Sequence, residues 1–215
     1  MLDNWTMSLA LVFLMFALFY AMAKQLGRPR GWFGRRFMGE ALNRGNKSML
    51  DAAVEGLQPK EGERIIDVGF GGGYALDRVR ERVAPARPVG VEISVPMIEA
   101  GRERWGDAVE LHRADATAMP FAEAGADAVL SVNTIYFWRE PRAALREIRR
   151  VLKPGGRLVL GVRRKSIIMR LSPVTWFGFR LYSVRQIEEL LRGAGFSMQV
   201  QEKVKGELIV VGRAL

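Results

Sequence analysis

The chain has 215 residues, of which 49% are hydrophobic and 26% charged, and these proportions are ordinary for a globular protein with a full hydrophobic core. It contains no cysteine, which excludes disulfides, zinc thiolate sites and thiol nucleophiles. The formal net charge of +10 favours an anionic partner, either a membrane surface or a nucleic acid. The single histidine, His112, follows a short apolar run, so we interpret it as a strand-end residue and expect no metal site.

An uncharged apolar segment comes first. From Trp5 to Ala23 no residue is charged. As a helix this segment spans roughly 28 Å at about 1.5 Å per residue, close to the ~30 Å hydrocarbon core of a bilayer. Residues 1–23 are therefore predicted to form a transmembrane anchor. A core helix usually carries a polar stripe, and a cleaved signal peptide, the other alternative, begins with a basic region where this chain has Asp3.

A basic segment follows, and residues 24–37 are predicted to be a juxtamembrane linker that lies along the membrane. Its five cations are accompanied by no acid and are interleaved with Trp32 and Phe33: Lys24, Arg28, Arg30, Arg35 and Arg36. The positive-inside rule places the N-terminus outside and the remaining chain in the cytoplasm of a single-pass cell-membrane protein. Nucleic acid is the competing partner, yet no nucleic-acid-binding module is recognisable, so we expect none to bind. A soluble cationic surface is the remaining alternative.

The most informative motif is a glycine-rich turn after a short apolar strand. Asp67 ends the strand, and glycines follow at 69, 71, 72 and 73. Such a turn lets the backbone approach a ligand closely, and the next strand ends in a second acid, Glu92, which can accept hydrogen bonds from ribose hydroxyls. A dinucleotide fingerprint needs a glycine where this chain has Tyr74. A carboxylate at Asp67 would repel a pyrophosphate but attract the ammonium of a methionyl group.

These residues resemble the first motif of the class I S-adenosylmethionine-dependent methyltransferases. Two further strings match in the family's order along residues 38–215. Ala114-Asp115-Ala116 with Pro120-Phe121 is similar to the adenine-contacting motif, and Arg149 to Leu158 is similar to the helix-turn-strand that precedes the fifth strand. The second string supports the fold rather than the chemistry, because Pro154 ends a helix and Gly155-Gly156 turns the chain.

The expected elements alternate between helix and strand in chain order. They are helix 40–57, strand 64–68, helix 74–83, strand 88–92, helix 97–104, strand 109–112, strand 127–132, helix 142–152, strand 158–162, helix 184–194 and strands 197–203 and 207–213. Ser183 and Gln186 form a predicted capping box. This rhythm predicts an α/β fold with a doubly wound, mostly parallel seven-stranded sheet, the Rossmann-like class I methyltransferase fold. The closing hairpin resembles that fold, in which an antiparallel seventh strand is inserted beside the others.

The resemblance implies the cofactor site. S-adenosylmethionine would place its ammonium at Asp67 and its ribose at Glu92 beside Ile93, with the glycines 69, 71 and 73 around its methionine part. Asp115 and the backbone N–H of Ala116 would contact the adenine. Met97 is expected either to pack on the adenine face or to serve simple helix packing. The product would be S-adenosylhomocysteine.

The acceptor site is expected after the fourth strand, where amino-directed members of the family carry two prolines between a polar residue and an aromatic one. Asn133 and Tyr136 keep the outer positions, but Thr134 and Ile135 replace the prolines. We therefore do not expect a planar amino acceptor, and we select Asn133, also counted in the cofactor site, and Tyr136 as the catalytic candidates. The aromatic run could equally be core. The basic and apolar segment 163–182 is expected to cap the pocket, to touch lipid or to fold back onto the sheet.

Three functions remain open. The first is a membrane-anchored enzyme that methylates a lipid, a quinone or another apolar small molecule. The second is a methyltransferase for a soluble small molecule, and the third is a non-catalytic module that binds S-adenosylmethionine. The fold alone does not choose between acceptors. The sequence also leaves the oligomeric state open.

Overall fold

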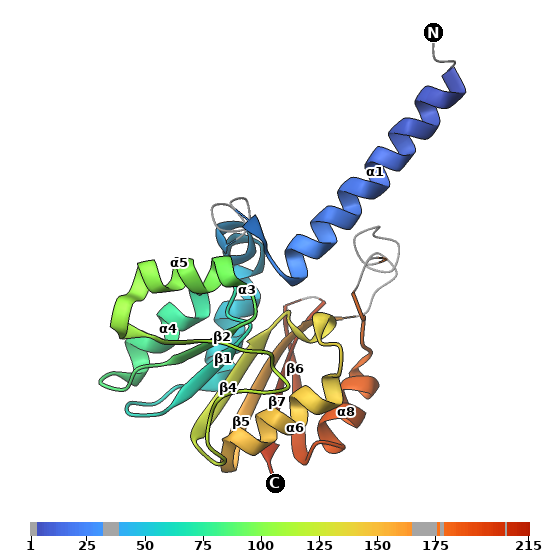
Figure 1. Ribbon diagram of the computed structural model, residues 1–215. Helices are drawn as coiled ribbons and strands as arrows, with labels where there is room; N and C mark the ends of the chain where they lie inside the picture. The colour runs from blue at the N-terminus through green and yellow to red at the C-terminus, as the bar shows by residue number, and fades with distance from the viewer. Residues whose placement is uncertain (1–3, 32–38, 165–175, 177–178, 205) are drawn as a thin grey trace.

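The computed structural model describes residues 4–31, 39–164, 176, 179–204 and 206–215. One long helix, α1 (Asn4–Gly27), projects away from an α/β domain, as Figure 1 shows. Its stretch Met7–Gly27 is long and apolar enough to cross a membrane, with a mean hydropathy of 1.9. Only 6% of that stretch is buried, which does not fit a core helix, although a signal sequence meets the same criteria of length and composition.

The domain is built on one seven-stranded sheet with the order β3-β2-β1-β4-β5-β7-β6. All pairs are parallel except those of β7, which runs antiparallel to both β5 and β6. The strands are β1 (Ile65–Val68), β2 (Val89–Glu92), β3 (Glu110–Arg113), β4 (Ala126–Val132), β5 (Leu152–Arg163), β6 (Phe196–Val204) and β7 (Glu207–Ala214). The predicted doubly wound fold and its inserted antiparallel strand are confirmed.

Helices cover both faces of the sheet because successive strand residues point to opposite sides. Ile65 packs in one cluster with α3 and α4, whereas Ile66 packs in another with α6 and α8. A third cluster joins α5 to the glycine-rich turn through Phe70 and Trp105. The helices are α3 (Gly39–Leu57), α4 (Tyr74–Val83), α5 (Val95–Trp105), α6 (Pro141–Val151) and α8 (Val184–Arg192), with short 3-10 helices η2 (Gly106–Ala108) and η3 (Ile135–Phe137).

Several boundaries differ from those expected. Helix α1 continues to Gly27, four residues beyond the predicted anchor, so the first part of the predicted linker is helical. Strand β5 begins at Leu152 instead of 158, because Leu152 already pairs with Ala126, and residues 153–156 form an irregularity with Gly155 at a φ of +73° before pairing resumes between Arg157 and Ala128. The capping box at Ser183 and Gln186 is present. Residues 32–37 of the linker and residues 165–175 and 177–178 of the basic segment lie outside the described residues.

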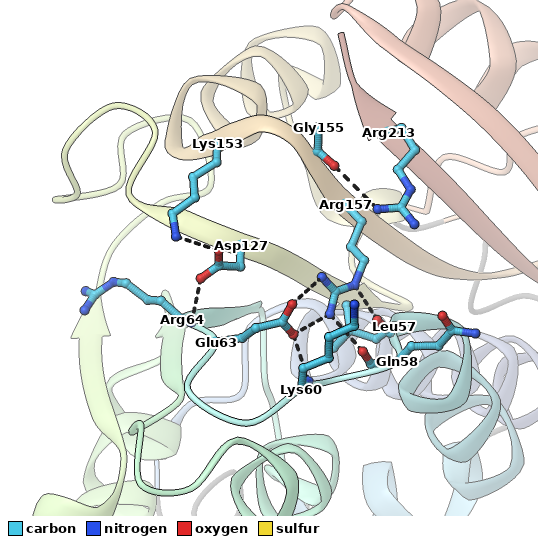
Figure 2. A network of polar contacts seen from close by, with 10 residues as sticks. All are labelled: Leu57, Gln58, Lys60, Glu63, Arg64, Asp127, Lys153, Gly155, Arg157 and Arg213. Carbon is cyan, nitrogen blue, oxygen red and sulfur yellow. Dashed lines mark hydrogen bonds and ion pairs between the residues drawn. The ribbon is translucent and has the colours of Figure 1, made fainter.

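A buried arginine fastens the edge of the domain opposite the glycine-rich turn. Figure 2 shows Arg157 of β5 with its guanidinium against Glu63 and the backbone carbonyls of Leu57 and Gln58. One guanidinium nitrogen donates to Glu63 Oε1 at 2.9 Å, and only 7% of Arg157 is exposed. Burial alone would raise the pKa of Glu63, but the hydrogen bonds from Arg157 and the Lys60 backbone hold it below its usual value. This cluster joins β5 to the end of α3.

Candidate functional site

A cavity of about 760 Å³ lies at the carboxyl ends of β1, β2 and β4, the edge where parallel α/β sheets bind ligands. Its volume lies in the range of small-molecule sites. Nine of the residues selected from the sequence border it or lie close by. Those that line it are Asp67, Gly69, Gly71, Glu92, Ile93, Asp115, Ala116 and Asn133, and Gly73 closes the same glycine-rich turn.

The glycines of the turn have different roles. Gly69 has a φ of +77°, and a Cβ there would lie 2.4 Å from Thr134 Cγ2, so no larger residue fits. Gly71 has a φ of +52° and lines the cavity. Gly73, at the N-cap of α4, packs against Trp105, and a Cβ there would lie 2.1 Å from the Trp105 ring. The first two glycines thus border the ligand space, whereas the third permits close packing of α4 against α5.

Asp67 is the most unusual group in the cavity. Its carboxyl is buried, with 4% of the residue exposed, and it makes no hydrogen bond or ion pair with any residue that the structure describes. Burial, and secondly the charge of Glu92, raise the pKa of Asp67 to about 8. A buried carboxyl without a partner is costly unless a ligand supplies one. Its position favours a cationic ligand group.

Glu92, by contrast, is fixed by the backbone. Its Oε1 accepts hydrogen bonds from the N–H groups of Ile93 at 2.8 Å and Ser94 at 2.9 Å, and its Oε2 accepts one from Gly71 at 3.3 Å. Burial raises the pKa of Glu92, although these hydrogen bonds and the charge of Arg28 oppose the rise. Three backbone N–H groups thus hold the side chain at the tip of β2.

The three residues expected near the adenine, Asp115, Ala116 and Met97, do not all line the same cavity. Asp115 and Ala116 line the cavity, and Asp115 Oδ1 is engaged locally by the backbone N–H of Thr117 at 2.9 Å and by its hydroxyl at 2.7 Å. Met97 is buried and lines a second cavity of about 430 Å³ between α3, α5 and the glycine-rich turn. The structure therefore does not bring Met97 to the larger cavity, and its packing role is the one that its surroundings favour. His112 lies in β3, where Nε2 is 2.6 Å from Glu110 Oε1.

The two acceptor candidates form one network but do not face the cavity equally. Asn133 lines it with a φ of +57°, and its Nδ2 donates to Asn46 Oδ1 at 2.8 Å. Tyr136 is not among the residues that line the cavity. Its hydroxyl donates to Asn133 Oδ1 at 3.3 Å and accepts a hydrogen bond from the Arg163 backbone N–H. Burial raises the pKa of Tyr136 to about 12, which does not suit a general base near neutral pH. Tyr136 positions Asn133 instead of touching the ligand space.

Two further walls of the cavity were not indicated by the sequence. Asn43, Asn46 and Leu50 of α3 line the cavity, and so do residues 23–24 and 26–30 at the end of α1. These residues carry no motif, and the contacts that bring them in are long-range. Thr134, selected only as a departure from the family's pattern, lines the cavity as well, and its hydroxyl is paired with that of Ser131.

Comparisons with known proteins identify the domain that contains this cavity. Residues 66–160 match the family described as methyltransferase domain. A demethylmenaquinone methyltransferase of Clavibacter sepedonicus is 39% identical over 111 residues, which cover 51% of this chain and 44% of that protein. The uncharacterized methyltransferase YdaC of Bacillus subtilis is 27% identical over 172 residues, which cover 79% of this chain and 92% of that protein.

Among solved structures, a chain of the complex between the Haloferax volcanii Trm112 methyltransferase activator and a methyltransferase has a TM-score of 0.76 at 22% identity. The match covers 91% of this chain and 97% of that chain, and it shows the common fold. Residues 66–160 are therefore a methyltransferase domain, and the chain as a whole shares its fold with solved S-adenosylmethionine-dependent methyltransferases. It spans about a third to just over half of the length of the first curated relatives, with 34%, 55% and 44% of three of them covered.

Proposed function

We propose that the protein is a membrane-anchored methyltransferase that transfers the methyl group of S-adenosylmethionine to an apolar acceptor, a lipid, a quinone or a similar small molecule. The buried carboxyl of Asp67 carries this proposal. It has no partner among the described residues and suits the ammonium of the cofactor's methionine part. Glu92 suits the ribose hydroxyls, and Gly69 and Gly71 leave space for the backbone to approach the ligand.

The chemistry asks little of the chain beyond positioning. S-adenosylmethionine, when bound, supplies a methyl group that its sulfonium has already activated. The residues around the cavity orient the acceptor and exclude water, which are the contributions that favour an in-line displacement. Asn133 is the polar group best placed to orient an acceptor, because Asn46 and Tyr136 fix both ends of its amide.

Two features support an apolar acceptor delivered from a bilayer. The first is α1, whose exposed apolar surface continues directly into the wall of the cavity. The second is the apolar part of that wall, which includes Leu26, Leu50, Phe137 and Trp138. The quinone-directed relative from Clavibacter sepedonicus is consistent with an acceptor of this class. In this proposal the positive residues after α1 lie at the cytoplasmic leaflet.

Incubation of membranes that contain the protein with methyl-labelled S-adenosylmethionine tests the proposal. We expect the label to appear in the organic extract, and membranes that contain the Asp67→Asn variant serve as the matched control. Label in aqueous metabolites or in protein would contradict the apolar acceptor and indicate a soluble one. Cofactor binding without any transfer of label would indicate a non-catalytic module.

A further inference from the structure

The end of α1 is more than a connection to the domain. Ala23 is 2% exposed although most of α1 is exposed, and Pro29 is buried between the exposed residues Arg28 and Arg30. These residues belong to the α1 end segment, residues 23–30, most of which lines the same cavity as Asp67. A flexible tether would leave its side chains in solvent. The burial instead indicates that the segment is packed onto the domain at the ligand site.

One contact fastens the segment over the cofactor half of the cavity. The hydroxyl of Ser94 donates a hydrogen bond of 2.7 Å to the backbone carbonyl of Pro29, and Ser94 is 1% exposed. The backbone N–H of the same serine holds Glu92, the residue proposed to bind ribose. Arg28, the residue before Pro29, lies close enough to Glu92 for its charge to act on that carboxylate. The cofactor half is therefore covered by the chain that leaves α1.

A second contact fastens the segment over the acceptor half. A Cβ at Gly27 would lie 2.5 Å from Phe137 Cδ1, so the last residue of α1 sits directly on the Phe137 ring. Phe137 belongs to η3, the turn that follows Asn133, and lines the cavity itself. Any larger residue in place of Gly27 would force the Phe137 ring to move. The α1 end segment thus bridges both halves of the site.

From these contacts we propose that the α1 end segment is the roof of the methyl-transfer site, with Ser94 and Gly27 as the positioning residues that hold it there. Helix α1 continues away from the domain beyond this roof (Figure 1), and its stretch Met7–Gly27 is long and apolar enough to cross a membrane. The roof encloses the cofactor and admits an apolar acceptor alongside α1. The functional unit then begins at about residue 23 instead of residue 38. This inference rests on the proposed function, since the cavity must be the cofactor site.

Cofactor affinity of the full-length chain in lipid nanodiscs tests the roof. We expect Ser94→Ala to bind S-adenosylhomocysteine roughly fivefold to tenfold more weakly in calorimetric titrations, because a buried carbonyl loses its donor and the roof opens. Its dissociation rate should rise more than its association rate falls. Ser197→Ala, at an exposed position of β6, is the matched control and should bind like the wild type.

Glycine substitutions give a second comparison. Gly27→Ala forces the roof away from Phe137, so we expect a similar loss of affinity. Gly45→Ala, in α3 with no atom near the added Cβ, should leave the affinity unchanged. The thermal midpoint of each variant, measured without ligand, separates loss of the roof from loss of the fold.

A thiol probe reports the roof directly, because the natural chain has no cysteine. Arg30 lines the cavity, so the single thiol of Arg30→Cys should react with a maleimide more slowly when S-adenosylhomocysteine is bound. The thiol of Ser197→Cys should react at the same rate with and without it. If the wild type binds the cofactor while Ser94→Ala binds it equally well and Cys labelling at position 30 is unaffected, the roof is refuted and the proposed function stands. A wild type that binds no cofactor overturns both.

Discussion

Cofactor binding should release a proton from Asp67. Burial and the neighbouring Glu92 raise the pKa of this carboxyl to about 8 in the protein without ligand. At pH 7 such a group is roughly 90% protonated, whereas an ordinary aspartate is ionised. A cationic ammonium placed beside it favours the ionised form, so binding lowers the pKa and expels the proton. We expect release of about 0.9 proton per cofactor at pH 7 and of about 0.5 at pH 8.

Calorimetric titration with S-adenosylhomocysteine in buffers of different ionisation enthalpy measures this number. The slope of the observed binding enthalpy against the buffer's ionisation enthalpy gives the protons released. Phosphate and Tris at the same pH provide a wide contrast. A wild type that binds the cofactor with no dependence on the buffer would show that Asp67 is already ionised, and the assignment of the ammonium to this residue would lose its basis.

The same carboxyl sets a pH dependence of stability. Its pKa in the fold lies above its unfolded value near 3.8, so the native state holds a proton that the unfolded state has lost. The free energy of unfolding should therefore fall as the pH rises from about 4 to about 8 and level off above that. Asp67→Asn removes the free-energy cost of ionising a buried carboxyl. The variant should therefore be more stable than the wild type at pH 8, by a few kcal/mol. Thermal unfolding without ligand across this pH range is the measurement, and a variant that is less stable at pH 8 would contradict the reasoning.

Three further outcomes follow from the geometry. Gly69→Ala should weaken cofactor binding at least tenfold in the same titrations, because its φ is positive and the added Cβ meets Thr134; unchanged affinity would contradict this. Arg157→Met should lower the free energy of unfolding by about 3–5 kcal/mol in urea, because Glu63 is left without its partner. The paired state of Glu63 holds its pKa low, so the wild-type advantage over this variant should shrink as the pH falls below about 4; an advantage independent of pH would contradict the pairing. Asn133→Ala should reduce the transfer of label at least tenfold with cofactor affinity nearly unchanged, and equal losses of both would place Asn133 on the cofactor instead.

That Asp67 and Glu92 border one cavity could be predicted from the sequence, because the determinants are local. Asp67 and Glu92 each end a short apolar run, and parallel strands bring their carboxyl ends to one edge of the sheet. The glycine-rich run after Asp67 indicates a tight turn where the backbone can approach a ligand. The hairpin at the end of the chain was equally visible, because two apolar runs follow one another there without a helix between them.

The rest of the site depends on contacts that no local pattern records. The hydrogen bond from Ser94 to Pro29 joins residues 65 positions apart, and the basic residues near Pro29 indicate by themselves only a linker that lies along the membrane. Tyr136 turns away from the cavity because η3 rotates the chain after Asn133, and spacing along the sequence does not show that rotation. Met97 was expected at the adenine with helical packing as the alternative, and α5 begins two residues earlier than expected and turns Met97 toward α3.

A titration of the full-length protein in detergent with two rival ligands tests the central claim most directly. The claim is that the cavity beside Asp67 and Glu92 binds a sulfonium nucleoside and not a dinucleotide. We predict a one-to-one binding heat with S-adenosylmethionine and none with a nicotinamide dinucleotide, and we predict that Asp67→Asn abolishes the first. Heat with the dinucleotide alone would contradict the account.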